Sequence, residues 1–249
     1  MTPTAAVAIE NLVKDYGDVR AVDGLSLSIS EAEVFGLLGP NGSGKTTTVN
    51  CLTGLLKPTS GAVKVGGFDV QAEGAKAREI MGVSPQETAV YQHLTGRENV
   101  RLFGALCSVP KESLENRIDY VMEKVGLTDD GGRRVGKYSG GMKRRVSIAM
   151  ALVQDPKVVL LDEPTVGMDP QSRRAIWDFI IELKEKGKSV LLTTHYMEEA
   201  EELCDRVGII DHGRLIELGP PAELKARHNA KDLEDVFLQL AGRRIREGS

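Results

Sequence analysis

The stretch from Gly39 to Thr46 has the residue types and the spacing of a loop that binds phosphate groups. A polyphosphate needs many hydrogen-bond donors and little steric bulk, and glycines let the backbone bend close and turn its N–H groups inward. The apolar residues 34–38 before the loop suit a strand, and residues 47–52 after it suit a helix, whose N-terminus adds the positive end of its dipole. The pattern predicts a phosphate-binding loop between a strand and a helix, with an ordinary glycine-rich turn as the alternative.

Two side chains at the end of this loop supply the rest of that chemistry. Lys45 can reach the outer phosphates as a point charge. The hydroxyl of Thr46 is placed to bind the Mg²⁺ that accompanies a polyphosphate. The pattern therefore predicts a polyphosphate ligand together with Mg²⁺.

A pair of carboxylates follows a strongly apolar stretch. Residues 158–161 are all Val or Leu, which suits a strand buried on both faces of a parallel sheet, and Asp162 and Glu163 come directly after them. Open α/β sheets place ligand chemistry at the C-terminal ends of their strands. Asp162 can hold a Mg²⁺ shell through water, and Glu163 can orient or deprotonate an attacking water. The alternative is an exposed acid pair at a strand end.

Two further polar residues follow predicted strands. Residues 189–194 suit another buried strand that ends at His195, on the same sheet edge as Glu163. From there His195 could contact a terminal phosphate or orient water, although a structural histidine is the better interpretation of that residue taken alone. Gln86 follows the short strand 80–84 and by itself reads as an ordinary polar loop residue.

Two other motifs are weak by themselves. Ser139, Gly140 and Gly141 precede a helix, so they form either a generic anion site or an N-cap, and position alone favours the cap. Tyr16 lies in a turn with Gly17, where a tyrosine is usually part of the core or of the turn itself.

Short apolar strands alternate with helical patterns along the chain, which favours an α/β fold around a parallel sheet. Residues 7–30 and 59–70 read as strands and turns of a small antiparallel sheet beside that core. We expect one domain over residues 1–249 in three parts: a core with its antiparallel β subdomain (1–92 and 157–218), a helical subdomain (93–156) and a C-terminal helical extension (219–249).

For two of the predicted helices, the sequence also predicts which face is buried or exposed to solvent. The helix that begins near Thr95 has the capping-box pair of Thr95 and Glu98, and its apolar face is predicted to consist of Val100, Phe103, Leu106 and Cys107. The helix predicted over residues 197–207 is acidic, and its glutamates are predicted to form a solvated face rather than a metal site: Glu198, Glu199, Glu201 and Glu202.

Composition excludes several classes. The 249 residues are 41% hydrophobic and 27% charged, as in ordinary globular proteins, and the net charge of −4 gives no support for a nucleic-acid partner. The cysteines Cys51, Cys107 and Cys204 are widely spaced, which predicts buried apolar residues rather than disulfides or a zinc site. The chain lacks a secretory signal and any apolar run of about 20 residues, so we expect a cytoplasmic chain whose membrane role comes from a partner.

Taken together, the motifs resemble those of the nucleotide-binding subunit of an ATP-binding cassette (ABC) transporter, across essentially the whole chain. Their order looks like that family's adenine-contacting loop, Walker A motif, Q-loop, signature, Walker B motif, D-loop and switch histidine. In this chain they are Tyr16, Gly39 to Thr46, Gln86, Ser139 to Gly141, Asp162 with Glu163, Asp169 and His195. The resemblance implies a P-loop NTPase with a RecA-like parallel-sheet core, an antiparallel β subdomain and an α-helical subdomain that carries the signature.

The resemblance also implies that this chain binds ATP with Mg²⁺ and hydrolyses ATP. The catalytic residues would be Glu163 as general base, His195, Lys45 and Gln86. The metal shell would involve Thr46, Gln86 and, indirectly, Asp162. Tyr16 would stack on the adenine ring. The residues expected to contact nucleotide are Tyr16, Gly39, Pro40, Asn41, Gly42, Ser43, Gly44, Lys45, Thr46, Thr47, Ser139, Gly140 and Gly141.

In that family the turn of Ser139, Gly140 and Gly141 would bind the γ-phosphate of the nucleotide held by a second copy or a homologous subunit. The resemblance therefore implies a head-to-tail dimer with ATP between its subunits. Hydrolysis opens such a dimer, and this motion can drive an integral membrane permease. The chain would lie on the cytoplasmic face of the membrane, bound to the permease through the region from Gln86 to Phe103.

Two departures from the family pattern indicate a branch. Tyr138 stands where Leu is usual in the signature, and Met142 stands where Gln is usual. Together with residues 94–99 and 233–237, they look like the drug- and antibiotic-exporting, sodium-exporting and ABC-2-type branch, which favours export. One alternative is a soluble cassette ATPase of translation or DNA repair, which usually joins two cassettes or inserts a long coiled coil. The other is a regulatory module with little turnover, against which an intact Glu163 and His195 argue.

Overall fold

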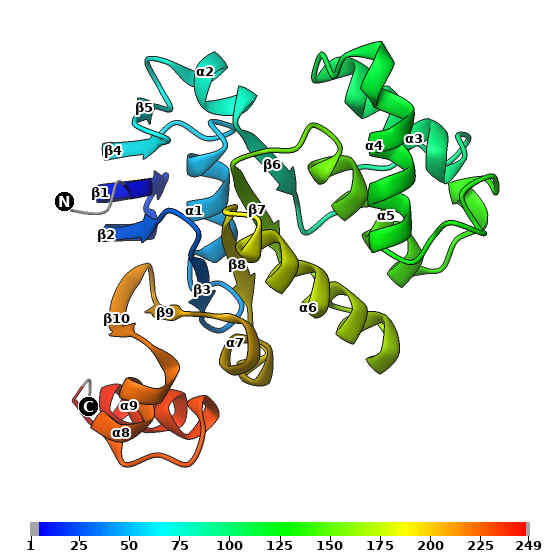
Figure 1. Cartoon of the computed structure of the whole chain (residues 1–249). Helices are drawn as coiled ribbons and strands as arrows, with labels where there is room; N and C mark the ends of the chain where they lie inside the picture. The colour runs from blue at the N-terminus through cyan, green and yellow to red at the C-terminus, as the bar shows by residue number, and fades with distance from the viewer. Residues whose placement is uncertain (1–4, 248–249) are drawn as a thin grey trace.

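Two β-sheets organise the molecule (Figure 1). The computed structural model describes residues 5–247, and the side chains of residues 5–240. The smaller sheet is antiparallel, has the strand order β2-β1-β4-β5 and carries the predicted alternation of buried and exposed residues, since one face packs on the core. Its strands are β1 (Ala5–Tyr16), β2 (Val19–Ser30), β4 (Ser60–Val65) and β5 (Phe68–Asp69).

The larger sheet has the order β10-β9-β3-β8-β7-β6 and is parallel, except that β10 runs antiparallel to β9. Every residue of β3, β7 and β8 is buried because packed layers cover both faces of the sheet. The predicted parallel core, with its antiparallel subdomain, is therefore confirmed. The strands are β3 (Val34–Leu38), β6 (Met81–Ser84), β7 (Val158–Asp162), β8 (Ser189–Thr194), β9 (Arg206–Asp211) and β10 (Arg214–Gly219).

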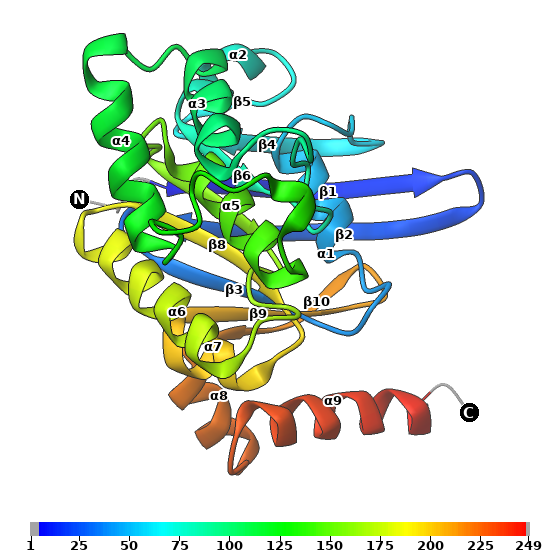
Figure 2. The ribbon, with the colours of Figure 1, turned by 90° about the vertical axis from the view of Figure 1, so that its right-hand side faces the viewer.

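Helix α1 (Lys45–Leu52) lies between the two sheets (Figure 2). Alternate residues of β3 serve the two faces of the large sheet: Phe35 and Leu37 pack into the cluster shared with α1 and the small sheet, whereas Val34 and Leu38 pack into the cluster on the other face. The phosphate loop joins β3 directly to α1, so both of its ends are held by buried apolar residues.

Three helices lie between β6 and β7 in the sequence and form a separate group in Figure 1. The capping box predicted at their start is present: the Glu98 N–H donates to Thr95 Oγ1, and the Thr95 N–H donates to a Glu98 carboxylate oxygen. The elements are α3 (Gly96–Leu106), α4 (Lys111–Lys124), the short 3₁₀ turn Val135–Lys137 and α5 (Gly140–Leu152). Helix α5 contacts β6 and so joins this group to the sheet.

The other helices cover the large sheet or follow its last strand. They are α2 (Gly74–Glu79), α6 (Pro170–Glu185), α7 (Met197–Leu203), α8 (Pro221–His228) and α9 (Leu233–Glu247). Helices α8 and α9 pack on each other after β10 (Figure 1). Within residues 5–247, no helix has both the length and the apolar character needed to cross a bilayer.

The predicted apolar face of α3 is only half right. Val100 is buried, but Leu106 and Cys107 are exposed, because α3 ends at Leu106 and Cys107 already forms its C-cap. The prediction that all three cysteines are buried therefore holds for Cys51 and Cys204 and is wrong for Cys107.

The predicted acidic face of α7 is also partly wrong. The helix ends at Leu203, and Glu199 is buried rather than solvated. Its Oε1 accepts hydrogen bonds from Thr165 Oγ1 at 2.8 Å and from Trp177 Nε1 at 3.0 Å. These donors replace water at Oε1, whereas Oε2 is buried without a hydrogen-bond partner among residues 5–240. The donors come from segments 22 and 34 positions away, beyond the reach of a helical pattern.

Candidate functional site

The phosphate loop needs its glycines for steric reasons. Gly42 and Gly44 have φ angles of 82° and 104°, in the left-handed region that side chains disfavour. A Cβ atom on Gly44 would lie 2.5 Å from the Ala21 carbonyl oxygen, and one on Gly39 would lie 2.2 Å from the Ile210 carbonyl oxygen. The loop is therefore pressed against β2 and β9, and only glycine fits at these positions.

A cavity of about 450 Å³ opens in front of the loop. It falls in the size range of small-molecule sites. Ser43 Oγ is buried and has no hydrogen-bond partner among residues 5–240, which fits a loop built to receive an acceptor-rich ligand. The residues that line the cavity are Ala21, Asn41, Gly42, Gly44, Lys45, Thr46, Thr47, Gln86 and Glu163.

Lys45 carries a buried charge at the base of this cavity. Its Nζ donates to the carbonyl oxygens of Gly39 at 2.7 Å and Pro40 at 3.0 Å, and it lies 4.0 Å from Glu163 Oε1. Burial lowers the pKa of Lys45, and the carboxylates of Glu163 and Asp162 act in the opposite direction. Because its nearest partners are mostly neutral carbonyls, this ammonium group would gain from an anion in the cavity.

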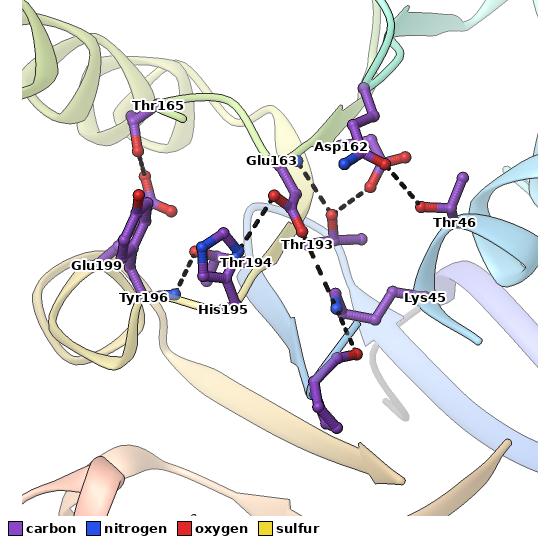
Figure 3. Close-up of polar contacts among 12 residues, drawn as sticks. Lys45, Thr46, Asp162, Glu163, Thr165, Thr193, Thr194, His195, Tyr196 and Glu199 are labelled. Atoms are coloured by element: carbon purple, nitrogen blue, oxygen red, sulfur yellow. Dashed lines mark hydrogen bonds and ion pairs between the residues drawn. The ribbon is translucent and has the colours of Figure 1, made fainter. Parts of the chain in front are cut away.

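Glu163 lies between two potential partners of a phosphate (Figure 3). The residue is 5% exposed, with Oε2 3.1 Å from His195 Nδ1 and Oε1 4.0 Å from Lys45 Nζ. Its φ angle is 53°, an uncommon value for a residue with a side chain and one that clusters at functional sites. The strand end therefore turns sharply and directs this carboxylate toward the loop.

Thr193 holds both acids in place, and sequence reasoning missed it (Figure 3). Its hydroxyl donates to Asp162 Oδ1 and accepts the Glu163 N–H at 3.0 Å, while its carbonyl also accepts that N–H at 3.1 Å. In the parallel pairing of β7 and β8, Asp162 is the register partner of Thr193. No local signal predicts this register, because it is set by the packing of two strands far apart in the sequence.

Three oxygen-bearing side chains lie where a cation would accompany phosphates. The Thr46 hydroxyl lies 3.5 Å from Gln86 Oε1, and Asp162 at the end of β7 is 1% exposed. Hydroxyl, amide and carboxylate oxygens are the ligands that Mg²⁺ prefers. Within the described part of the chain, no group of three or more His, Cys, Asp or Glu side chains could hold a metal. These three residues would thus fit a Mg²⁺ ion that takes further ligands from phosphates and water.

Several of the predicted nucleotide contacts do not line this cavity: Gly39, Pro40 and Ser43 of the loop itself, Tyr16, and the turn of Ser139, Gly140 and Gly141. Ser139 caps α5 by accepting the Met142 N–H at 3.2 Å, and Ser139 and Gly140 are exposed. Tyr16 is 47% exposed at the end of β1, with Lys14 Nζ 5.2 Å from its ring centre. Neither the Ser139 turn nor Tyr16 lines the cavity of the same chain.

A second residue that sequence reasoning missed is Gly213, in the turn between β9 and β10. Its N–H donates to the Ser43 carbonyl at 2.9 Å, and its carbonyl accepts the Asp23 N–H at 2.9 Å. The turn therefore braces the phosphate loop from outside. The dipeptide His212-Gly213 predicts a hairpin turn, but nothing local indicates what the turn contacts.

Comparison with known proteins shows the family to which the chain is related. The family model of the ABC transporter matches residues 22–166. The linearmycin resistance ATP-binding protein LnrL of Bacillus subtilis is 43% identical over 238 residues, which cover 96% of this chain and 75% of that protein. The doxorubicin resistance ATP-binding protein DrrA of Mycobacterium tuberculosis is 43% identical over 244 residues, which cover 97% and 72%.

Solved structures agree in fold. A structure of the ATP-binding subunit of an ABC transporter has a TM-score of 0.88 and 26% identity, covering 96% of this chain and 100% of that one. The dimeric, post-hydrolysis structure of the ATP-binding cassette MJ0796 with ADP and Pi has a TM-score of 0.79 and 27% identity, covering 86% and 98%. The chain described here therefore belongs to the ABC transporter family and carries its ATPase domain.

Proposed function

We propose that two copies of this chain, or one copy and a homologous subunit, enclose ATP and Mg²⁺ between them, and that hydrolysis drives export through a separate membrane permease. The observation that carries the proposal is the buried carboxylate of Glu163, held between Lys45 and His195 at the wall of the loop cavity. A base in that position can take a proton from a water that attacks the terminal phosphate.

The other residues in and around the cavity have complementary roles in this reaction. Lys45 and the loop N–H groups would bind the β- and γ-phosphates, where they stabilise the charge on the transferred phosphoryl group. His195 would orient the water and donate to the γ-phosphate. Thr46 and Gln86 would hold Mg²⁺, with Asp162 acting through water, and the ion would neutralise negative charge on the phosphates. The proton of the water would leave on Glu163.

The second half of the site would come from the other subunit. Ser139, Gly140 and Gly141 begin an exposed helix end that does not reach the cavity of its own chain, so their contact with phosphate requires another copy. The exposed ring of Tyr16 would stack on adenine. The dimeric neighbour with ADP and Pi supports this arrangement.

A groove beside the helical group is the proposed permease contact. It encloses about 320 Å³ between the core and helices α3 and α5, and its wall includes the exposed Leu55, the half-buried Phe103 and the buried Met150. Phe103 is the end of the region from Gln86 expected to dock the permease. A structural neighbour, CbiO1, is part of the ABC transporter complex CbiONQ, with a TM-score of 0.79 and 28% identity. Docking there would hold the chain at the cytoplasmic face of the membrane.

The names of the similar proteins support export as the direction of transport. LnrL and DrrA are resistance proteins, and the Nod factor export ATP-binding protein I of Paraburkholderia xenovorans is 41% identical over 235 residues. The same proposal divides the chain into a core with antiparallel subdomain (1–92 and 157–218), a helical subdomain (93–156) and a C-terminal extension (219–249). The grouping of α3, α4 and α5 supports the second part. No nucleic-acid partner is expected.

Replacement of Glu163 by Gln tests the ATPase part. The variant keeps hydrogen bonding but not the base, so we expect hydrolysis to fall by about 100-fold or more while ATP drives stable dimerisation, measured by phosphate release and light scattering. Glu202→Gln, at an exposed glutamate on α7, is the control. A parental rate in Glu163→Gln would rule out the general-base role, and a monomer in saturating ATP would rule out the dimer.

The permease part has a separate test. Leu55 is 74% exposed in the groove, and Val19, 66% exposed, lies outside it. The tagged chain should recover a polytopic membrane protein from detergent-solubilised membranes, and Leu55→Asp should reduce that recovery several-fold, whereas Val19→Asp should not. Equal recovery by both variants would contradict docking in the groove.

A further inference from the structure

Arg144 joins helix α5 to two loops of the catalytic site. The side chain is 4% exposed, and its two terminal nitrogens donate to four backbone carbonyls. Nη1 donates to the carbonyl oxygens of Pro85 and, at 2.7 Å, Gln86, and Nη2 donates to those of Asp162 and, at 2.6 Å, Glu163. One guanidinium group therefore contacts the loop after β6 and the end of β7 together.

This contact has an unusual composition. No carboxylate among residues 5–240 forms a salt bridge with Arg144, and its Nε is buried without a hydrogen-bond partner. The charge is held by backbone carbonyls. Burial lowers the pKa of Arg144, and the carboxylates of Asp162, Glu163 and Glu199 act in the opposite direction. A guanidinium is planar and its donors have fixed directions, so four bonds to two loops fix the positions of those loops relative to each other.

Arg144 lies on α5, the helix that begins directly after the turn of Ser139, Gly140 and Gly141. Ser139 is the N-cap of α5, and Arg144 follows it by five positions, about 7.5 Å along the axis at 1.5 Å per residue. Any displacement of this helix must therefore move or break the hydrogen bonds to the Gln86 and Glu163 backbones.

We propose that Arg144 is a positioning residue that couples the place of Ser139, which serves the ATP of the second subunit, to Gln86 and Glu163 in its own site. This inference rests on the proposed function, because it requires the Ser139 turn to act on a second subunit. Arrival of that subunit's nucleotide at the Ser139 turn would adjust the base and the Gln86 loop through a single side chain. Arg144 touches no phosphate and acts only through the residues it holds.

The next residue provides a matched comparison. Arg145 lies on the same helix and is likewise an arginine that binds backbone carbonyls, those of Val125 at 3.0 Å and Gly126 at 2.8 Å. Both of these carbonyls belong to the segment that follows α4, so Arg145 stays within the helical group. The two arginines lie on the same helix and both donate to backbone carbonyls. Only Arg144 contacts the Gln86 loop and the end of β7.

The first experiment compares Arg144→Gln, Arg144→Lys and Arg145→Gln in the full chain. We expect Arg144→Gln to bind ATP within threefold of the parent and to lose kcat by at least 30-fold with KM changed less than threefold. Arg144→Lys should restore no more than a tenth of kcat, since one ammonium group cannot span both loops. Arg145→Gln should retain kcat within threefold. Full activity in either Arg144 variant would overturn the proposal, and thermal melting shows which variants are folded.

A second experiment measures the ATP-dependent movement of the helical group instead of the rate of hydrolysis. Trp177 on α6 is the sole tryptophan, and Cys107, at the end of α3, is the exposed cysteine among three. Energy transfer from Trp177 to an acceptor on Cys107 would report movement of the helical group. In the Glu163→Gln background, ATP should change this transfer in the parent and in Arg145→Gln, and change it at least threefold less in the Arg144 variants.

The outcomes separate the inference from the function on which it rests. An ATP response of parental size in Arg144→Gln or Arg144→Lys would overturn the coupling, and so would a parent that binds ATP without any response. If the parent does not hydrolyse ATP, or Glu163→Gln does not dimerise, the proposed function fails instead, and neither measurement involves Arg144.

Discussion

Two glycine-rich turns in this molecule both lead into a helix, but their N-caps and surroundings differ. Both precede a helix N-terminus, which is a favourable place for an anion. In the phosphate loop the N-cap is Gly44, with a left-handed φ of 104° and no side-chain hydrogen bond to the helix. At the start of α5 the N-cap is Ser139, whose own side chain accepts the Met142 N–H. At the first helix end no side chain caps the helix, whereas at the second the Ser139 hydroxyl accepts one backbone N–H and the turn itself stays exposed.

Their surroundings differ as well. The phosphate loop is enclosed by Ala21, Ile210 and Gly213, and it borders a cavity that Glu163 also lines. A Cβ atom on Gly140 would meet no atom within 4 Å. The comparison shows that a local motif supplies the donors, whereas the surrounding elements decide whether they face a cavity of the same chain or the open surface.

The largest expected difference between the turns is in ATP binding by a single copy. Lys45→Ala removes the buried ammonium group, and we expect the affinity for ATP to fall by about 100-fold or more, because charge-assisted contacts to phosphate are lost. Lys143→Ala, beside the second turn, should change it less than threefold. Both substitutions are made in the Glu163→Gln background. Their ATP affinities are measured by calorimetric titration at a protein concentration that keeps the chain monomeric. Equal losses in both variants would remove the distinction.

Stability provides the next comparison. In Gly44→Ala the new methyl group would lie 2.5 Å from the Ala21 carbonyl at a left-handed φ, so we expect a loss of about 2 to 3 kcal/mol in the free energy of unfolding. In Gly140→Ala there is room and no left-handed φ, so the change should stay within about 0.5 kcal/mol. Urea denaturation measures both. Comparable losses would show that the second turn is as constrained as the first.

Ser139→Ala should separate the role of Ser139 as a helix cap from its role in ATP-driven dimerisation. The loss of the cap is expected to cost about 1 kcal/mol of stability. ATP affinity of the monomer should stay within threefold, while ATP-driven dimerisation in the Glu163→Gln background should weaken about tenfold, as expected for one lost phosphate contact. Analytical ultracentrifugation measures dimerisation. A variant that dimerises like its parent would place the Ser139 hydroxyl outside the nucleotide contact.

The smallest effect concerns a contact away from both turns, between α4 of the helical group and α6. Burial alone would raise the pKa of Glu182, but hydrogen bonds from Lys124, Lys186 and Tyr120 outweigh it and lower the pKa to about 2. A carboxylate with a lowered folded-state pKa stabilises the fold above its unfolded pKa of about 4.5, and this contribution disappears as the pH falls toward about 2.

Glu182→Gln should therefore lose about 1 kcal/mol at pH 7, a modest amount for a partly exposed cluster, and the gap to the parent should narrow steadily below pH 4.5. Denaturation at a series of pH values measures it, with the exposed Glu185→Gln as the control. A gap that does not depend on pH would show that packing, and not charge, is responsible.

The strand ends and the phosphate loop of this site are predictable because their signals are local. A run of buried residues ending in Asp162, a glycine pattern ending in Lys45 and the Thr95 capping box each lie within a few positions of the element that they define. Periodicities of 2 and 3.6 residues place a side chain on a face of its own element. They do not state which other element will cover that face.

The sequence by itself therefore determined the α/β class, the phosphate loop with Lys45 and the carboxylates at the end of β7. Only the tertiary structure decided that Thr193 ties Asp162 to Glu163, that Arg144 reaches both the Gln86 loop and the end of β7, and that Glu199 is buried. Each of these contacts joins residues at least 18 positions apart. Their partners are chosen by strand register and helix packing, which depend on burial across the whole core and not on local sequence.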